Sequence, residues 1–179
     1  MNLYVVRHGQ TDVNLENKIN SINDDDLNKT GIEEAKNLKN VFSNINYDLI
    51  ICSPLTRTKH TAKLLNVINA ELIFDKRLIE RDAGILTKQS LDNIDSNDWW
   101  NVYPKNDYKD AETVHSVIKR IYSFLDELKI KYINKNIVLV THGGVSKVIR
   151  SYFDGIPEDG NLEKYSHKNC EVKTYEIIQ

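Results

Sequence analysis

The sequence predicts an α/β fold, a three-layer α/β/α sandwich with a mostly parallel central sheet. Short apolar runs recur along the chain and are continuous rather than alternating, which is typical of strands buried on both faces. Segments with helical periodicity separate these runs. No internal repeat or proline- and glycine-rich linker divides the 179 residues, a length near that of one domain. We therefore expect a single domain over residues 1–179.

The first half of the chain is predicted to begin with a strand, a helix and two more strands around a second helix. The strands are the apolar runs at residues 3–6, 49–52 and 71–74. Thr30 and Glu33 have the capping-box spacing that opens a helix, which ends before Asp48. The expected buried face of this helix consists of Ile32, Ala35, Leu38, Phe42 and Ile45.

The second helix is predicted to start directly after the strand at residues 49–52. Ser53 is a suitable N-cap, and Pro54 is favoured at the first helical position, so Arg57 falls in the first turn. The irregular stretch at residues 75–90 contains Glu80 and no clear periodicity. Because loops at the edge of a sheet often carry function, we expect functional residues there.

The second half is predicted to contain one long helix, two strands and a helix between them. The long amphipathic helix runs from Ala111 to about Tyr132 and is opened by Asp110 or Thr113. A buried strand at residues 137–140 leads into a helix with an apolar face. The last strand is expected at residues 172–178.

Composition narrows the classes of partner. Hydrophobic residues make up 40% of the chain and charged residues 28%, and no apolar run approaches membrane-spanning length, so we expect no membrane partner. A net charge of −2 argues against nucleic-acid binding but permits a small cationic pocket. Since the N-terminus has no signal-peptide pattern, we expect a cytoplasmic protein. Cys52 and Cys170 have no metal-ligand spacing and are expected to be free, partly buried thiols.

Potentially reactive side chains follow four of the predicted strands. They are Arg7 and His8, then Arg57, then Glu80, and finally His142 with Gly143. Because the carboxyl ends of parallel strands meet at one edge of a sheet, these groups can converge. The N–H groups of an arginine guanidinium can bind two phosphate oxygens at once, and a helix N-terminus carries partial positive charge. The sequence therefore predicts a site for a phosphate ester.

His8 is suited to attack phosphorus in such a site. A neutral imidazole can do so if one ring nitrogen keeps its proton and the other carries the lone pair. Arg7 and Arg57 should disfavour a further positive charge and keep His8 neutral. Glu80 can then protonate the leaving oxygen. General acid–base catalysis raises the reaction rate by only about 10²–10⁴-fold, so charge stabilisation must supply much of the remaining acceleration.

Four motifs give the chain a close resemblance to the histidine phosphatase superfamily, in its phosphoglycerate-mutase-like branch. They are RHGQTDVN at residues 7–14, SPLTRTKHTA at 53–62, ERDAG at 80–84 and THGG at 141–144. The resemblance implies the fold of that family and a phosphohistidine on His8. It also implies that Glu80 is the acid and base, and that Arg7, Arg57 and His142 hold the phosphoryl group. Substrate contacts would come from Asn14, Arg81 and the Gly143 N–H, with a surface ion pair as the alternative for Arg81.

Two positions depart from the family pattern. The family usually has an aromatic residue before Gly84 and often a glycine where Lys88 stands, whereas this chain has Ala83 and Lys88. The compact chain favours a metal-independent phosphatase of small phosphorylated metabolites, without a cofactor. A phosphoglycerate-type mutase is the first alternative. A non-catalytic phosphate-binding regulator is the second. The substrate and the oligomeric state, monomer or homo-oligomer, stay open.

Two features outside the motifs have plain structural interpretations. Trp99 and Trp100 could line a lid over the substrate, but packing of a loop onto the core is favoured. The acidic run Asp24-Asp25-Asp26 is expected to be a solvated loop, because it lacks the downstream pattern of a calcium site. His60, His115 and His167 show no metal-ligand spacing, and we expect no metal.

Overall fold

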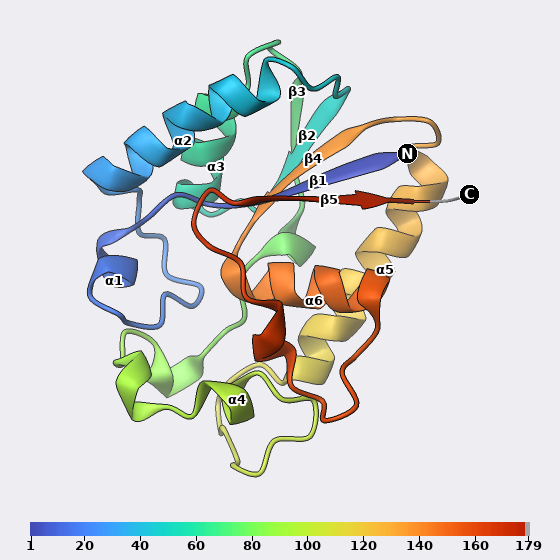
Figure 1. Cartoon of the computed structure of the whole chain (residues 1–179). Coiled ribbons are helices and arrows are strands. Elements are labelled where there is room, and N and C mark those ends of the chain that lie inside the picture. The colour runs from blue at the N-terminus through green and yellow to red at the C-terminus, as the bar shows by residue number, and fades with distance from the viewer. Residues whose placement is uncertain (178–179) are drawn as a thin grey trace.

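Five strands form one central sheet in the computed structural model, which describes residues 1–177 (Figure 1). They are β1 Asn2–Arg7, β2 Leu49–Cys52, β3 Glu71–Phe74, β4 Ile137–Thr141 and β5 Val172–Glu176. Their order across the sheet is β3-β2-β4-β1-β5. The first four run parallel, and β5 pairs antiparallel with β1 at the edge. The mostly parallel sheet is confirmed. The predicted last strand ends at Glu176, and Ile178 lies outside the described residues.

Helices cover both faces of the sheet, which confirms the three-layer arrangement. The helices are α1 Asp12–Leu15, α2 Lys29–Phe42, α3 Thr56–Leu65, α4 Ser96–Trp99, α5 Val114–Lys131 and α6 Gly143–Asp154. Figure 1 shows α2 and α3 on one side of the sheet and α5 and α6 on the other. The short α1 and α4 lie away from the sheet, in the long connections that follow β1 and β3.

The sheet separates two hydrophobic cores. Val5 of β1 packs in the core that α5 and α6 complete, whereas its neighbour Val6 packs in the core of α2 and α3. Every residue of β2 and β4 is buried. Because side chains alternate between the two faces and both faces are covered, these strands need apolar residues at every position. This explains why their sequences are continuous apolar runs.

The start of α2 differs from the prediction. Its N-cap is Asn28, whose side-chain oxygen accepts a hydrogen bond from Gly31 N at 2.9 Å. Thr30 is an exposed residue of the first turn, so the expected capping box does not form. Asparagine caps at least as well as threonine, and it lies two residues earlier in the chain. Ile45 lies beyond the C-cap of this helix and packs onto the core from the following loop.

The start of α3 also differs from the prediction. The helix begins at Thr56 with Leu55 as its N-cap, so Ser53 and Pro54 precede it. The Ser53 hydroxyl contacts Nε2 of His142 at 2.8 Å instead of capping the helix. For α5, by contrast, Thr113 is confirmed as one of the two expected caps, because its side chain accepts from Ser116 N.

Within residues 1–177, no helix combines the length and the apolarity that a membrane span requires. Cys52 is buried and Cys170 partly buried, and both are free, as expected. Burial raises the pKa of each thiol to about 12, so both are neutral and weakly reactive at neutral pH.

Candidate active site

A cavity of about 420 Å³ opens at the carboxyl ends of the parallel strands. Six of the eight predicted site residues line it: Arg7, His8, Asn14, Glu80, Arg81 and Gly143. The other two, Arg57 and His142, are fully buried beside His8. The Arg57 Nε atom lies 3.3 Å from His8 Nε2, and the rings of His8 and His142 are 5.3 Å apart between centroids. The structure thus brings the predicted residues together.

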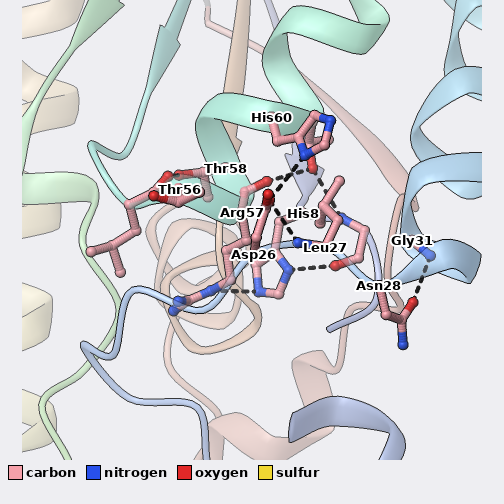
Figure 2. Close-up of polar contacts among 12 residues, drawn as sticks. His8, Asp26, Leu27, Asn28, Gly31, Thr56, Arg57, Thr58 and His60 are labelled. Carbon is pink, nitrogen blue, oxygen red and sulfur yellow. Dashed lines mark hydrogen bonds and ion pairs between the residues drawn. The ribbon is translucent and has the colours of Figure 1, made fainter. Parts of the chain in front are cut away.

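Two neighbours fix the protonated nitrogen of His8. Its Nδ1 lies 2.7 Å from the Gly9 carbonyl oxygen, and its Nε2 faces Nε of Arg57 (Figure 2). A carbonyl only accepts and a guanidinium only donates. His8 therefore keeps its proton on Nδ1 and carries its lone pair on Nε2.

The surroundings of His8 also keep the ring neutral. The side chain is 2% exposed, and burial holds its pKa well below the ordinary value of 6.5. The positive charges of Arg57 and Arg7 lower this pKa further. The expected direction is confirmed, but burial is a larger cause than the two arginines on which the sequence argument relied.

Arg57 is positioned by the loop that follows α1. Its Nη1 donates to the Asn23 carbonyl oxygen and its Nη2 to that of Ser21 at 2.9 Å. Burial lowers the pKa of Arg57 to about 10, which leaves the guanidinium charged at neutral pH. These two acceptors could not be predicted from residue types, because every residue carries a backbone carbonyl.

The acidic run beside this loop is more than a solvated segment. Asp24 is exposed, yet its carboxylate accepts a hydrogen bond from Thr56 N at the start of α3. Asp26 contacts Nδ1 of His60 on the same helix at 2.9 Å (Figure 2). Both contacts fasten the loop to α3, the helix that carries Arg57.

A threonine that the sequence analysis did not single out links His8 to α3. Gly9 N donates to Thr61 Oγ1 at 3.1 Å, and Thr61 Oγ1 donates to the Arg57 carbonyl oxygen at 2.8 Å. Thr61 is fully buried. Its place four residues after Arg57, on the same face of a helix, was the available signal.

Two nitrogens near His8 are buried without a hydrogen-bond partner in residues 1–177. One is Nε of Arg7, whose Nη1 donates to the His167 carbonyl oxygen at 2.7 Å. The other is Nδ1 of His142.

The Arg7 guanidinium packs on Gly143, where a Cβ atom would lie 3.2 Å from the Arg7 Cζ. Burial also holds the pKa of His142 well below 6.5.

Glu80 is anchored at the N-terminus of α6. Its Oε2 accepts from Gly144 N at 3.0 Å, and its Oε1 accepts from Arg81 N at 2.9 Å. Both contacts hold the carboxylate on the cavity wall with a fixed orientation. Glu80 thus lines the cavity, and its role as acid and base stays a prediction.

The side chains of Asn14 and Arg81 both form hydrogen bonds with other groups of the protein. The Asn14 side-chain oxygen accepts from Thr11 N at 3.2 Å in the capping box of α1. Arg81 is 4% exposed, which rules out a surface ion pair. Its Nε donates to the Glu112 carbonyl oxygen at 2.6 Å and its Nη1 to that of Trp99, while its Cζ lies 3.5 Å from the Trp99 ring centroid.

Trp99 and Trp100 are both buried, so the packing interpretation of these residues is confirmed. They also line the cavity. The two departures from the family pattern have structural accounts. Ala83 is a core residue whose N–H donates to Ser21 Oγ at 2.8 Å. Lys88 has a φ of 63°, the left-handed conformation that favours glycine.

Comparison with known proteins agrees with this geometry. A family model of the histidine phosphatase superfamily (branch 1) matches residues 3–179. The uncharacterized phosphatase PhoE of Bacillus subtilis is 30% identical over 152 residues, which are 84% of this chain and 76% of that protein. A protein of Enterobacter sp. named probable phosphoglycerate mutase GpmB is 28% identical in an alignment of 180 positions that covers 96% of this chain and 83% of that protein.

A solved structure has the same fold. The α-ribazole phosphatase of Shigella flexneri superposes with a TM-score of 0.85 at 24% identity, and the match covers 100% of this chain and 92% of that one. The resemblance carried by the four motifs is therefore confirmed by both sequence and fold. The chain belongs to the histidine phosphatase superfamily, branch 1, and is an enzyme of this phosphatase and mutase group.

Proposed function

We propose that this enzyme hydrolyses phosphate monoesters of small metabolites through a phosphohistidine on His8, without a metal ion. The observation that carries the proposal is the state of His8. Its Nδ1–H is held by the Gly9 carbonyl, burial keeps the ring neutral, and the side chain lines the cavity. A neutral imidazole with its lone pair on Nε2 is the form that attacks phosphorus.

The reaction has two steps. In the first, His8 Nε2 forms a bond to phosphorus, the ester P–O bond breaks, and Glu80 gives its proton to the leaving oxygen. In the second, Glu80 takes a proton from water, the water oxygen attacks phosphorus, and the P–N bond breaks. Inorganic phosphate leaves, and the lone pair returns to Nε2.

Buried donors around His8 support charge stabilisation in both steps. Nε of Arg7 and Nδ1 of His142 lack partners within residues 1–177, and buried polar groups are normally hydrogen-bonded. Phosphoryl oxygens are suitable acceptors for the Arg7 N–H, and also for His142 Nδ1 in the tautomer whose Nε2 accepts from the Ser53 hydroxyl. The Arg7 and Arg57 guanidinium groups, together with the N-terminus of α6, supply the positive charge that a metal supplies in other phosphatases.

The test compares wild type with His8→Ala on p-nitrophenyl phosphate and on a panel of phosphorylated metabolites. His115→Ala is the control, because His115 is exposed. We expect turnover in wild type and control, unaffected by EDTA, and no turnover in His8→Ala. A phosphoryl label that resists base but not acid should be trapped on wild type only. Binding of phosphate esters without turnover or labelling would instead support the non-catalytic regulator.

The mutase alternative is supported by the relative named probable phosphoglycerate mutase, which aligns with 96% of this chain. A mutase must return the phosphoryl group to the sugar acid before water reaches it. Product partition separates the two functions. With 3-phosphoglycerate and a bisphosphate primer, the phosphatase releases free phosphate, whereas a mutase yields mainly the isomeric phosphoglycerate.

A further inference from the structure

The cavity extends beyond the phosphoryl site, and the charges of this outer part balance one another. Lys147 of α6 is 8% exposed, and its Nζ lies 2.6 Å from Oε2 of Glu163. The same ammonium lies 4.9 Å from the centroid of the Trp100 ring. Burial lowers the pKa of Lys147, and Glu163 is the nearest group that offsets this effect. The positive charge of Lys147 is thus paired with the carboxylate of Glu163.

The other two cations on the outer wall are engaged as well. Lys18 Nζ lies 2.6 Å from Glu16 Oε2. Arg81 donates to two backbone carbonyls and stacks on Trp99. Each of these cations therefore already has an acceptor from the protein, and a second anionic group on a substrate would compete with these acceptors.

A buried acceptor on the same wall points to a hydroxyl group. Asn20 is 8% exposed and lines the cavity, and its Oδ1 has no partner in residues 1–177. Its Nδ2 donates to Thr11 Oγ1 at 2.8 Å, and Thr11 Oγ1 in turn donates to Asn14 Oδ1 at 3.1 Å. With the Thr11 hydroxyl donating to Asn14, the Asn20 amide places its nitrogen against Thr11 and leaves its oxygen in the unpartnered position. That oxygen requires a donor.

From these contacts we infer that the substrate's leaving group is a neutral, hydroxyl-rich alcohol, so that the enzyme acts on polyol and sugar phosphates in preference to phosphorylated carboxylic acids. This inference deepens the proposed function and rests on it. A hydroxyl both donates and accepts, so it can satisfy Asn20 Oδ1 and can join the Lys147–Glu163 pair. A carboxylate only accepts, and it would face Glu163 and Asn20 Oδ1 without a donor to give.

The experiment uses substrate pairs that differ in one group. Glycerol 3-phosphate is compared with 3-phosphoglycerate, and glucose 6-phosphate with 6-phosphogluconate, using purified wild type. We expect kcat/KM to be at least about tenfold higher for the neutral member of each pair. Equal values or a preference for the acids would overturn the inference while leaving the proposed function intact. Absence of His8-dependent hydrolysis of every ester, p-nitrophenyl phosphate included, would overturn both.

A variant tests the charge argument directly. Glu163→Gln removes the counter-charge of Lys147, so the ratio of kcat/KM values should move toward 3-phosphoglycerate by about tenfold. Glu158→Gln is the matched control, since Glu158 is exposed and does not line the cavity. An unchanged ratio in Glu163→Gln would contradict the role of the pair, and the comparison of substrates with wild type stands even if the variant does not fold.

Discussion

A closed ring of hydrogen bonds surrounds the nucleophile at the residue scale. His8 donates to the Gly9 carbonyl, Gly9 N–H donates to Thr61, Thr61 donates to the Arg57 carbonyl, and Arg57 faces His8 Nε2. The ring ties the protonated nitrogen of His8 and its lone pair to one rigid helix, α3. Thr61 is a positioning residue in this arrangement, because it touches neither ring nitrogen yet holds the N–H of Gly9, the residue whose carbonyl contacts Nδ1.

Thr61→Val should slow phosphoryl transfer to His8 while preserving side-chain shape. The change leaves the buried Gly9 N–H unpaired and frees the His8 ring to shift, and a misplacement of about 1 Å can slow phosphoenzyme formation by about 10²-fold. Thr61→Ser keeps the hydroxyl and should restore most of the rate. Rapid-quench measurement of the phosphoenzyme across pH tests this. Equal rates in the Val and Ser variants would mean that the hydroxyl does not position His8.

Glu80→Gln should have an effect that depends on the leaving group. An alkyl phosphate releases an alkoxide that needs a proton, so the rate of phosphoenzyme formation should fall about 10²–10⁴-fold. Nitrophenolate leaves without a proton, so p-nitrophenyl phosphate should show a much smaller fall in the same step. Single-turnover kinetics with both esters give the comparison. Equal losses would show that Glu80 does not protonate the leaving oxygen.

The reactive side chains of the site could be predicted from the sequence better than the groups that position these side chains. Arg7, His8 and Glu80 were found because their residue types are tied to strand ends and to family motifs. The carbonyls of Ser21 and Asn23 were not, since backbone acceptors carry no sequence signal. The Lys147–Glu163 pair was also missed, because the partners lie on separate elements that only the folded chain brings together.

At the scale of elements, the start of α2 offers a direct test. Asn28→Ala removes the side chain that accepts from Gly31 N, and loss of an N-cap costs about 1 kcal/mol in the free energy of unfolding. Thr30→Ala, at the position that the sequence favoured, should change it by less than about 0.5 kcal/mol, because Thr30 is exposed within the first turn. Urea unfolding of both variants measures the difference. The reverse order would make Thr30 the effective cap.

Strand positions were predictable and helix starts less so, for a physical reason. The runs at β2 and β4 are apolar at every residue, and burial on both faces admits few alternatives. Helix caps compete locally, and several candidates within a few residues differ by only tenths of a kcal/mol. Ser53 shows how tertiary structure decides such a competition, because its hydroxyl contacts His142 rather than capping α3.

At the scale of the whole molecule, strand order assembles the site. The order β3-β2-β4-β1-β5 places β2, β4 and β1 side by side, although long stretches of chain separate them. Their carboxyl ends deliver Arg57 by way of α3, His142, and the pair Arg7 and His8. The α2 and α3 side of the sheet contributes the groups that orient His8, and the α6 side contributes Glu80's anchor and Lys147. Periodicity predicted these strands but not their order, which depends on long-range pairing.

This concentration of buried neutral histidines makes the molecule sensitive to acid. Burial lowers the pKa of His8 and His142 well below 6.5 and that of His167 to about 4. Below pH 6.5 the unfolded chain therefore binds more protons than the folded one, so stability falls as pH decreases from 6.5 toward 4. At about pH 5.5 each of these histidines lowers the free energy of unfolding by up to about 1.4 kcal/mol relative to its value at neutral pH.

Urea unfolding at about pH 7.5 and pH 5.5 should thus show a loss of up to about 4 kcal/mol for the three histidines together. His142→Asn removes one of these titrating groups, so its loss between the two pH values should be smaller by about 1.4 kcal/mol. His115→Gln should match wild type, because His115 is exposed and is not one of the three buried rings. A free energy of unfolding that is equal at both pH values would show that these rings are not held neutral by the fold.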